Sequence, residues 1–196
     1  MKFMLSFCTA VLAVFLLFTC LPVHGEEAIY DSMIRLHVLA ESDSAADQAK
    51  KLEVRDAVLA VLADAVGEAD SYESALAAAD AHRESIRILA EEIAGCPVTV
   101  TLTREKYPVR FYEKFTLPAG EYMSLRVILG EGAGKNWWCV LFPQLCTAQA
   151  SEDAFYEDFI AAGFSAEQYQ LIRRESGVKY KIRFRVLEIL SELIKE

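Results

Sequence analysis

The sequence is poor in the residues that build metal sites and nucleophilic active sites. Its 196 residues include three histidines and five cysteines. No two histidines stand at the spacing of metal ligands, and the chain has neither a Cys-x-x-Cys pair nor a Gly-x-Ser-x-Gly hydrolase motif. We therefore predict no bound metal and no cofactor, and the motifs do not indicate an enzyme.

Basic residues are also in short supply. Twenty lysines and arginines face 29 aspartates and glutamates, which gives a formal net charge of −9. Binding to a phosphate backbone requires a basic face, whereas the acids here are spread along the whole chain. The sequence therefore excludes nucleic acid as an expected partner.

The N-terminus holds the one long apolar run. Lys2 precedes an uncharged stretch from Phe3 to Val23, and Gly25 is followed by two glutamates. This pattern predicts that residues 1–25 are a signal peptide cleaved after Gly25, or an uncleaved anchor, because about 20 apolar residues span a bilayer. In both cases we expect the rest of the chain outside the cytoplasm, with membrane contact only through this segment or at the periphery.

Removal of that segment leaves three cysteines, Cys96, Cys139 and Cys146. In an oxidising compartment three pairings are open. Cys139 and Cys146 flank Pro143, which favours a bend that brings the two cysteines together. We therefore predict a Cys139–Cys146 disulfide.

Periodicity predicts an α+β fold. Strand-like alternation occurs at residues 34–38, 98–102, 109–111, 122–129 and 137–142, and helical spacing occurs at 45–67 and 70–95. Ser44 with Asp47, and Asp70 with Glu73, are spaced like helix-start capping boxes. The expected architecture is a mainly antiparallel sheet, read as a meander, covered by two amphipathic helices and followed by a C-terminal helical extension.

Three parts are expected along the chain. They are residues 1–25, an α+β signalling domain at 26–147, and an amphipathic extension at 148–196. Residues 151–164 have helical spacing that ends near Gly163. Residues 178–186 alternate and the residues after them have helical spacing, so this tail is either a strand followed by a helix or one basic amphipathic helix. It either covers the core or docks on a membrane or a partner.

A glycine-rich stretch, GEGAGK at residues 130–135, superficially resembles a phosphate-binding loop. Such a loop requires glycine at the position of Leu129 and a hydroxyl residue at the position of Asn136. It should also precede a helix, whereas a strand-like segment follows here. The stretch is therefore interpreted as a turn. Trp137 and Trp138 come next, and adjacent strand positions point to opposite faces, so one of them is available as an interface anchor.

A polar cluster marks the end of the first strand and the start of the first helix: Arg35, His37, Glu41, Ser42, Asp43 and Ser44. It is either a capped helix start with a satisfied histidine or a binding site, because function often lies at strand ends. A catalytic alternative uses Cys139 as nucleophile or His37 as base, in an extracytoplasmic hydrolase. Another alternative is a membrane-anchored structural subunit.

Three segments together resemble the stage II sporulation protein R family of endospore-forming bacteria. They are IRLHVLAESDS with DQAKKLEVRDAV, LPAGEY with LRV, and the stretch from Gly130 through NWWCVLFPQLC, so the resemblance covers roughly residues 30–147. It implies a protein secreted across the forespore membrane into the intermembrane space. There it would activate a membrane-embedded aspartic protease of the mother cell, on its extracytoplasmic face, and so trigger processing of the sigma-E precursor.

The resemblance carries no catalytic residues, so we expect a binding protein and not an enzyme. The residues we expect to contact the partner lie in the two most distinctive segments. They are Arg35, His37, Ser42, Asp43, Ser44, Lys135, Asn136, Trp137 and Trp138.

Overall fold

The computed structural model describes residues 7, 11, 26–145 and 152–173. Residues 26–173 form one compact unit, and the two ends of the chain form another. Of that second unit only positions 7 and 11 are described, both as helix. The predicted signal peptide, apart from these two positions, and the tail at 178–186 lie outside the described residues. Among the described residues, no helix is long and apolar enough to cross a membrane.

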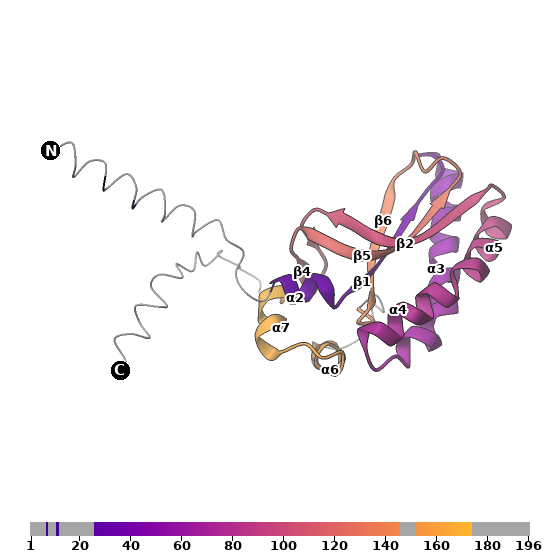
Figure 1. The fold of residues 1–196 in the computed structure, drawn as a ribbon. Helices are drawn as coiled ribbons and strands as arrows, with labels where there is room; N and C mark the ends of the chain where they lie inside the picture. Colours follow the sequence, from indigo (N-terminus) through magenta and orange to yellow (C-terminus); the bar gives the residue numbers. More distant parts are fainter. Residues whose placement is uncertain (1–6, 8–10, 12–25, 146–151, 174–196) are drawn as a thin grey trace. The chain divides into compact units, whose positions relative to one another are not determined.

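A four-stranded sheet forms the centre of the compact unit (Figure 1). Its strands, in the order β2-β5-β1-β6, are Val98–Tyr107, Gly120–Leu129, Ile34–Leu39 and Asn136–Phe142. Strand β1 pairs parallel to β5 and antiparallel to β6, and β2 pairs antiparallel to β5. The predicted α+β class with a mainly antiparallel sheet is confirmed.

The expectation of a simple meander is wrong, because β1 lies between β5 and β6. All six residues of β1 are buried, and a strand buried on both faces belongs in the interior of a sheet. A parallel pairing such as β1 with β5 requires a long crossover connection, and the helices after β1 lie within that connection. Tertiary burial therefore places β1 between two strands that are consecutive in sequence.

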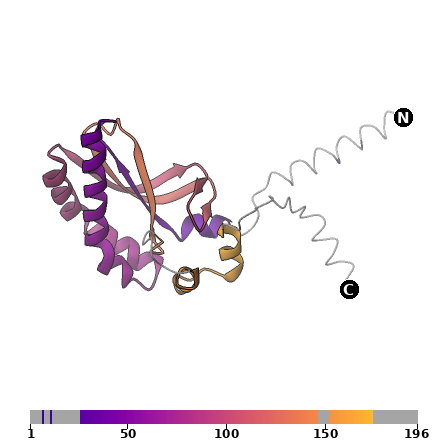
Figure 2. The same ribbon diagram turned by 180° about the vertical axis from the view of Figure 1, so that it is seen from behind.

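Three helices cover one face of the sheet: α3 (Ala45–Gly67), α4 (Tyr72–Ala81) and α5 (Arg83–Ala94), as Figures 1 and 2 show. The predicted first helix is confirmed, and its Ser44 cap accepts a hydrogen bond from the backbone N–H of Asp47. Buried side chains of α3, including Val58 and Leu62, pack with Leu36 of β1 and Leu125 of β5.

The predicted second helix is in fact two helices, α4 and α5, joined at His82. The ring Nδ1 of His82 lies 2.8 Å from the carbonyl oxygen of Ala78, which also accepts the backbone N–H of His82. A side chain that bonds a carbonyl of the preceding turn competes with the helical ladder, and α4 ends here. The predicted start of this helix, a capping box of Asp70 and Glu73, is also wrong, because the capping box of α4 is formed by Ser71 and Ser74. The expected end at Gly95 is confirmed by its left-handed conformation, with φ of 69°.

Shorter elements cover part of the opposite face. They are α2 (Glu26–Asp31), β3 (Arg110–Phe111), β4 (Thr116–Leu117), α6 (Glu152–Ala161) and α7 (Ala166–Ile172). Helix α6 confirms the helical prediction for 151–164, whereas α7 was not predicted. Buried residues of these elements, such as Leu117, Phe159 and Ile172, form a second apolar cluster with Tyr107 and Tyr122 of the sheet.

Leu36→Ala tests whether the helix-covered core determines stability. Leu36 is fully buried in that core, so we expect the substitution to lower the free energy of unfolding by about 2–5 kcal/mol. Leu52→Ala on α3 is the control, because Leu52 is 39% exposed, and it should cost less than about 1 kcal/mol. Urea denaturation followed by circular dichroism measures both, and equal losses would contradict this description of the core.

Candidate functional site

The polar residues of the sheet gather on the face that points away from α3. Alternation along each strand places Arg35 and His37 of β1 on this face, together with residues of β2, β5 and β6. In the strand register Arg126 lies beside His37, which lies beside Trp138, so these three side chains form a row across the sheet.

His37 lies at the middle of this row and is 4% exposed. Its Nδ1 is 3.0 Å from both carboxylate oxygens of Glu105, and its Nε2 is 2.9 Å from Oδ1 of Asn136. The ring stacks on Trp138, with centroids 5.3 Å apart. Both ring nitrogens therefore have an oxygen partner within the protein.

The carboxylate of Glu105 extends this network toward the core. It accepts a hydrogen bond from Oγ of Ser124 at 3.0 Å, and Ser124 Oγ lies 2.7 Å from the hydroxyl of Tyr107. Burial raises the pKa of Tyr107, so this hydroxyl stays protonated. Arg126 Nε lies 3.8 Å from the same carboxylate. We call His37, Glu105, Ser124, Tyr107 and Asn136 the His37 network.

Arg35 lies next to this network and has no exposed surface. Its guanidinium carbon lies 3.8 Å from the ring centroid of Tyr107 and 5.0 Å from that of Tyr122. One terminal nitrogen donates to the hydroxyl of Tyr112 at 2.6 Å, while Nε and Nη1 have no hydrogen-bond partner. Among the described ion pairs none includes Arg35, so aromatic rings are the main neighbours of this buried cation.

The Ser42-Asp43-Ser44 turn forms a second polar cluster at the start of α3. Oγ atoms of Ser42 and Ser44 both donate to Asp47 Oδ2, at 2.5 and 2.9 Å, and these two hydrogen bonds lower the pKa of Asp47. Asp43 accepts the backbone N–H of Lys135 at 2.8 Å, which joins the turn to the glycine-rich stretch. This stretch thus contacts the helix cap through its own backbone.

Close approach explains the glycine at position 134. A Cβ atom there would lie 2.3 Å from the carbonyl oxygen of Ser42, and the Gly134 N–H donates to the carbonyl of Ala40 at 2.9 Å. Gly130 and Gly132 have positive φ values of 56° and 64°, where side chains are strained. The interpretation of residues 130–135 as a turn is confirmed. At least two of its N–H groups are used within the protein.

The structure divides the nine candidate contact residues into two groups and one outlier. Arg35, His37, Asn136 and Trp138 share one face of the sheet, and Ser42, Asp43, Ser44 and Lys135 meet at the start of α3. The outlier, Trp137, packs on the helix-covered side, with the Arg55 guanidinium 5.2 Å from its ring centroid.

Sequence reasoning missed three members of the His37 network, namely Glu105, Ser124 and Tyr107. The strand predicted at 98–102 stopped too early, because alternation of valine and threonine gives way there to charged residues. In a longer strand, side chains two positions apart lie on the same face, so Glu105 and Tyr107 lie on the face of the threonines at positions 99, 101 and 103.

Cys139 does not lie beside His37. It belongs to the apolar cluster under the helices, and Leu36 is its neighbour on β1, so its side chain is on the face opposite to His37. The two therefore do not form a thiol–imidazole pair. Cys146 lies outside the described residues, and the Cys139–Cys146 disulfide stays a prediction.

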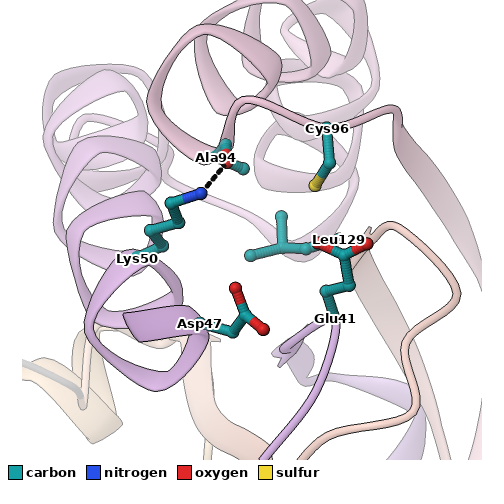
Figure 3. A pocket seen from close by; sticks show the side chains of 6 residues that line it. All are labelled: Glu41, Asp47, Lys50, Ala94, Cys96 and Leu129. Carbon is teal, nitrogen blue, oxygen red and sulfur yellow. Dashed lines mark hydrogen bonds between the residues drawn. The ribbon is translucent and has the colours of Figure 1, made fainter. Parts of the chain in front are cut away.

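The depression at the C-terminal end of α5 is too small for a ligand (Figure 3). It is lined by Glu41, Asp47, Lys50, Ala94, Cys96 and Leu129. Lys50 Nζ donates to the carbonyl of Ala94 at 2.6 Å across it. Burial, followed by the charge of Glu41, raises the pKa of Cys96, which disfavours the reactive thiolate. Within the described part of the chain, no group of three histidine, cysteine or acidic side chains is placed so that it could hold a metal ion.

Comparison with known proteins gives one family. The family model described as stage II sporulation protein R (spore_II_R) matches residues 30–152. Among curated proteins, the stage II sporulation protein R of Bacillus subtilis (strain 168) is 30% identical over 187 residues, which covers 84% of this chain and 83% of that protein. No solved structure matches the chain significantly.

Arg35→Met tests the role of the buried cation. Replacing a buried charge by an apolar side chain of similar length is often neutral, so we expect the free energy of unfolding to change by less than about 1 kcal/mol. Arg35→Ala also removes the stacking on Tyr107 and leaves a cavity, and should cost about 3 kcal/mol or more. Urea denaturation compares the two variants, and an equal loss in both would show that the charge itself stabilises the fold.

Asp47→Asn should make stability depend on pH in a defined way. Because the folded-state pKa of Asp47 is lowered, its contribution to stability is present above the unfolded-state pKa of about 4 and is lost as the pH falls through the lower folded value. Wild type should therefore melt above Asp47→Asn at pH 7, and the gap should shrink in acid. Thermal unfolding from pH 2 to 7 measures this. Glu53→Gln, an exposed carboxylate on the same helix, controls for the loss of a charge.

Proposed function

The chain belongs to the stage II sporulation protein R family, and we propose that within this role in sporulation it acts as an exported, non-enzymatic activator of a protease. The protease is a membrane-embedded aspartic protease of the mother cell, bound on its extracytoplasmic face. Activation would trigger processing of the sigma-E precursor. In this proposal the chain crosses the forespore membrane and acts in the intermembrane space.

The occupancy of His37 is the observation that most favours binding over catalysis. Glu105 and Asn136 each contact one of its two ring nitrogens. Cys139 lies on the other face of the sheet, so it offers His37 no nucleophile. Catalysis by His37 would require its contacts with Glu105 or Asn136 to break first, whereas a role in binding leaves these contacts intact.

A network of this kind suits recognition because it holds the surface in one shape. The stacking of Trp138 on His37, together with the hydrogen bond from His37 to Asn136, fixes side chains contributed by two strands. A surface that is ordered before binding loses little conformational entropy when the partner arrives. Aromatic side chains and arginines, both present here, are the residues that most often dominate binding energy.

Deletion of residues 2–25 tests the export step of this proposal. In sporulating cells that lack their own family member, the full chain should restore cleavage of the sigma-E precursor, and the deletion should abolish it, because the activator would stay in the forespore. Replacing residues 2–25 by an unrelated cleavable signal peptide is the matched control and should restore cleavage. The measurement is immunoblotting of precursor and product, and unimpaired cleavage with the deletion would contradict a secreted signal.

A further inference from the structure

Two large apolar side chains project from the hairpin formed by β3 and β4, residues 108–117. Val109 is 41% exposed and Phe111 is 65% exposed, the highest value for a large apolar residue among the described residues of the compact unit. Residues two apart on an extended segment point to the same side. Val109 and Phe111 therefore form one outward apolar surface, which we call the hairpin ridge.

Arg110, between them, and Tyr112, which follows Phe111, point inward and hold the hairpin on the sheet. The Arg110 guanidinium carbon lies 3.4 Å from the ring centroid of Trp138, and Tyr112 accepts the hydrogen bond from the buried Arg35. Tyr112 also stacks on Phe115 with centroids 4.5 Å apart. The hairpin ridge is thus supported by the same surface that contains His37, and it does not need to be ordered on binding.

The segment that carries the ridge is basic in a chain that is otherwise acidic. Residues 106–114 contain Lys106, Arg110 and Lys114 against one acid, Glu113, for a net charge of +2. The described ion pairs include no carboxylate for Arg110, and Arg126 shares Glu105 with His37. Because the whole chain has a formal net charge of −9 and this segment has +2, the residues outside the segment carry a net charge of −11. This edge of the molecule therefore favours a negatively charged surface.

We propose that the hairpin ridge is the docking surface of the chain and that its occupant is a protein: an apolar pocket that takes Phe111 and Val109, bordered by carboxylates that complement the net positive charge of residues 106–114. This inference rests on the proposed function, because the protein that carries the pocket is the activated protease. Phe111 is the central anchor, and the net positive charge of the segment sets the orientation.

A protein pocket fits these observations better than an anionic bilayer. The segment has a net charge of only +2, and each lysine or arginine near an anionic membrane surface contributes about 1 kcal/mol, so its charge would attract it to a bilayer only weakly. Two apolar side chains also bury little area in a membrane, where even a single myristoyl chain gives only marginal binding. In a protein pocket one aromatic anchor is often enough to dominate the binding energy.

The decisive variant is Val109→Ser/Phe111→Ser in the full chain, tested for restoration of sigma-E precursor cleavage in cells that lack their own family member. We expect cleavage to fall about tenfold or more, as for the loss of a central anchor. Ile88→Ser on α5 removes another exposed apolar side chain, 54% exposed, and should leave cleavage unchanged. Unchanged melting temperatures would show that both variants fold.

The outcomes separate this inference from the function it rests on. If the wild-type chain itself fails to restore cleavage, the proposed function is wrong. If wild type and the double variant restore it equally, the activator function stands and the hairpin ridge is not its docking surface. Loss of cleavage with Ile88→Ser as well would also overturn the assignment, because the effect would then not be specific to the ridge.

A binding measurement decides between protein and lipid. Purified chain is sedimented with vesicles that carry the protease and with protein-free vesicles of the same anionic lipids. Binding only to the first, weakened about tenfold by Val109→Ser/Phe111→Ser and clearly reduced by Lys106→Glu, is the expected result. Equal binding to both preparations would show that the ridge docks on lipid and not in a protein pocket. Binding to neither would show that the ridge is not a docking surface.

Discussion

The burial of polar side chains in the central strand is the constraint on which the rest of the structure depends. Strand β1 is buried on both faces, yet it contains Arg35 and His37 at adjacent positions on one of them. Buried polar groups that lack partners destabilise a fold strongly. The carboxylate of Glu105 and the amide of Asn136 supply both partners of His37, from β2 and β6, and the hydroxyl of Tyr112 in the hairpin accepts a hydrogen bond from one of the nitrogens of Arg35.

This constraint explains why the two faces of the sheet differ. The face under α3, α4 and α5 is packed with leucine, valine and alanine, which need only close contact. The other face combines aromatic rings with charged groups, and stacking of Arg35 on Tyr107 and of Arg110 on Trp138 replaces ordinary ion pairs. Both faces of the sheet therefore contribute apolar contacts, and the face away from α3 also holds the buried Arg35 and His37.

The two most distinctive sequence segments, the Ser42-Asp43-Ser44 turn and the glycine-rich stretch at 130–135, contact each other directly. Asp43 in the Ser-Asp-Ser turn accepts the Lys135 N–H, and Gly134 approaches the Ser42 carbonyl where no other residue fits. This contact fixes where β6 begins, and so where Asn136 and Trp138 lie relative to His37. A pattern that suggests a ligand-binding loop thus positions the candidate site through its own backbone.

The sequence by itself determined several of the local elements and the family. Caps at Ser44 and Gly95, and alternation in residues 34–38 and 122–129, depend on neighbours a few positions away, so period and cap signals were enough. Only the tertiary structure decided that β1 lies between β5 and β6, that Glu105 meets His37 across 68 positions, and that Cys139 faces away from it. The physical reason is that strand order and partner choice depend on burying whole faces at once, and this condition acts on residues far apart in the chain.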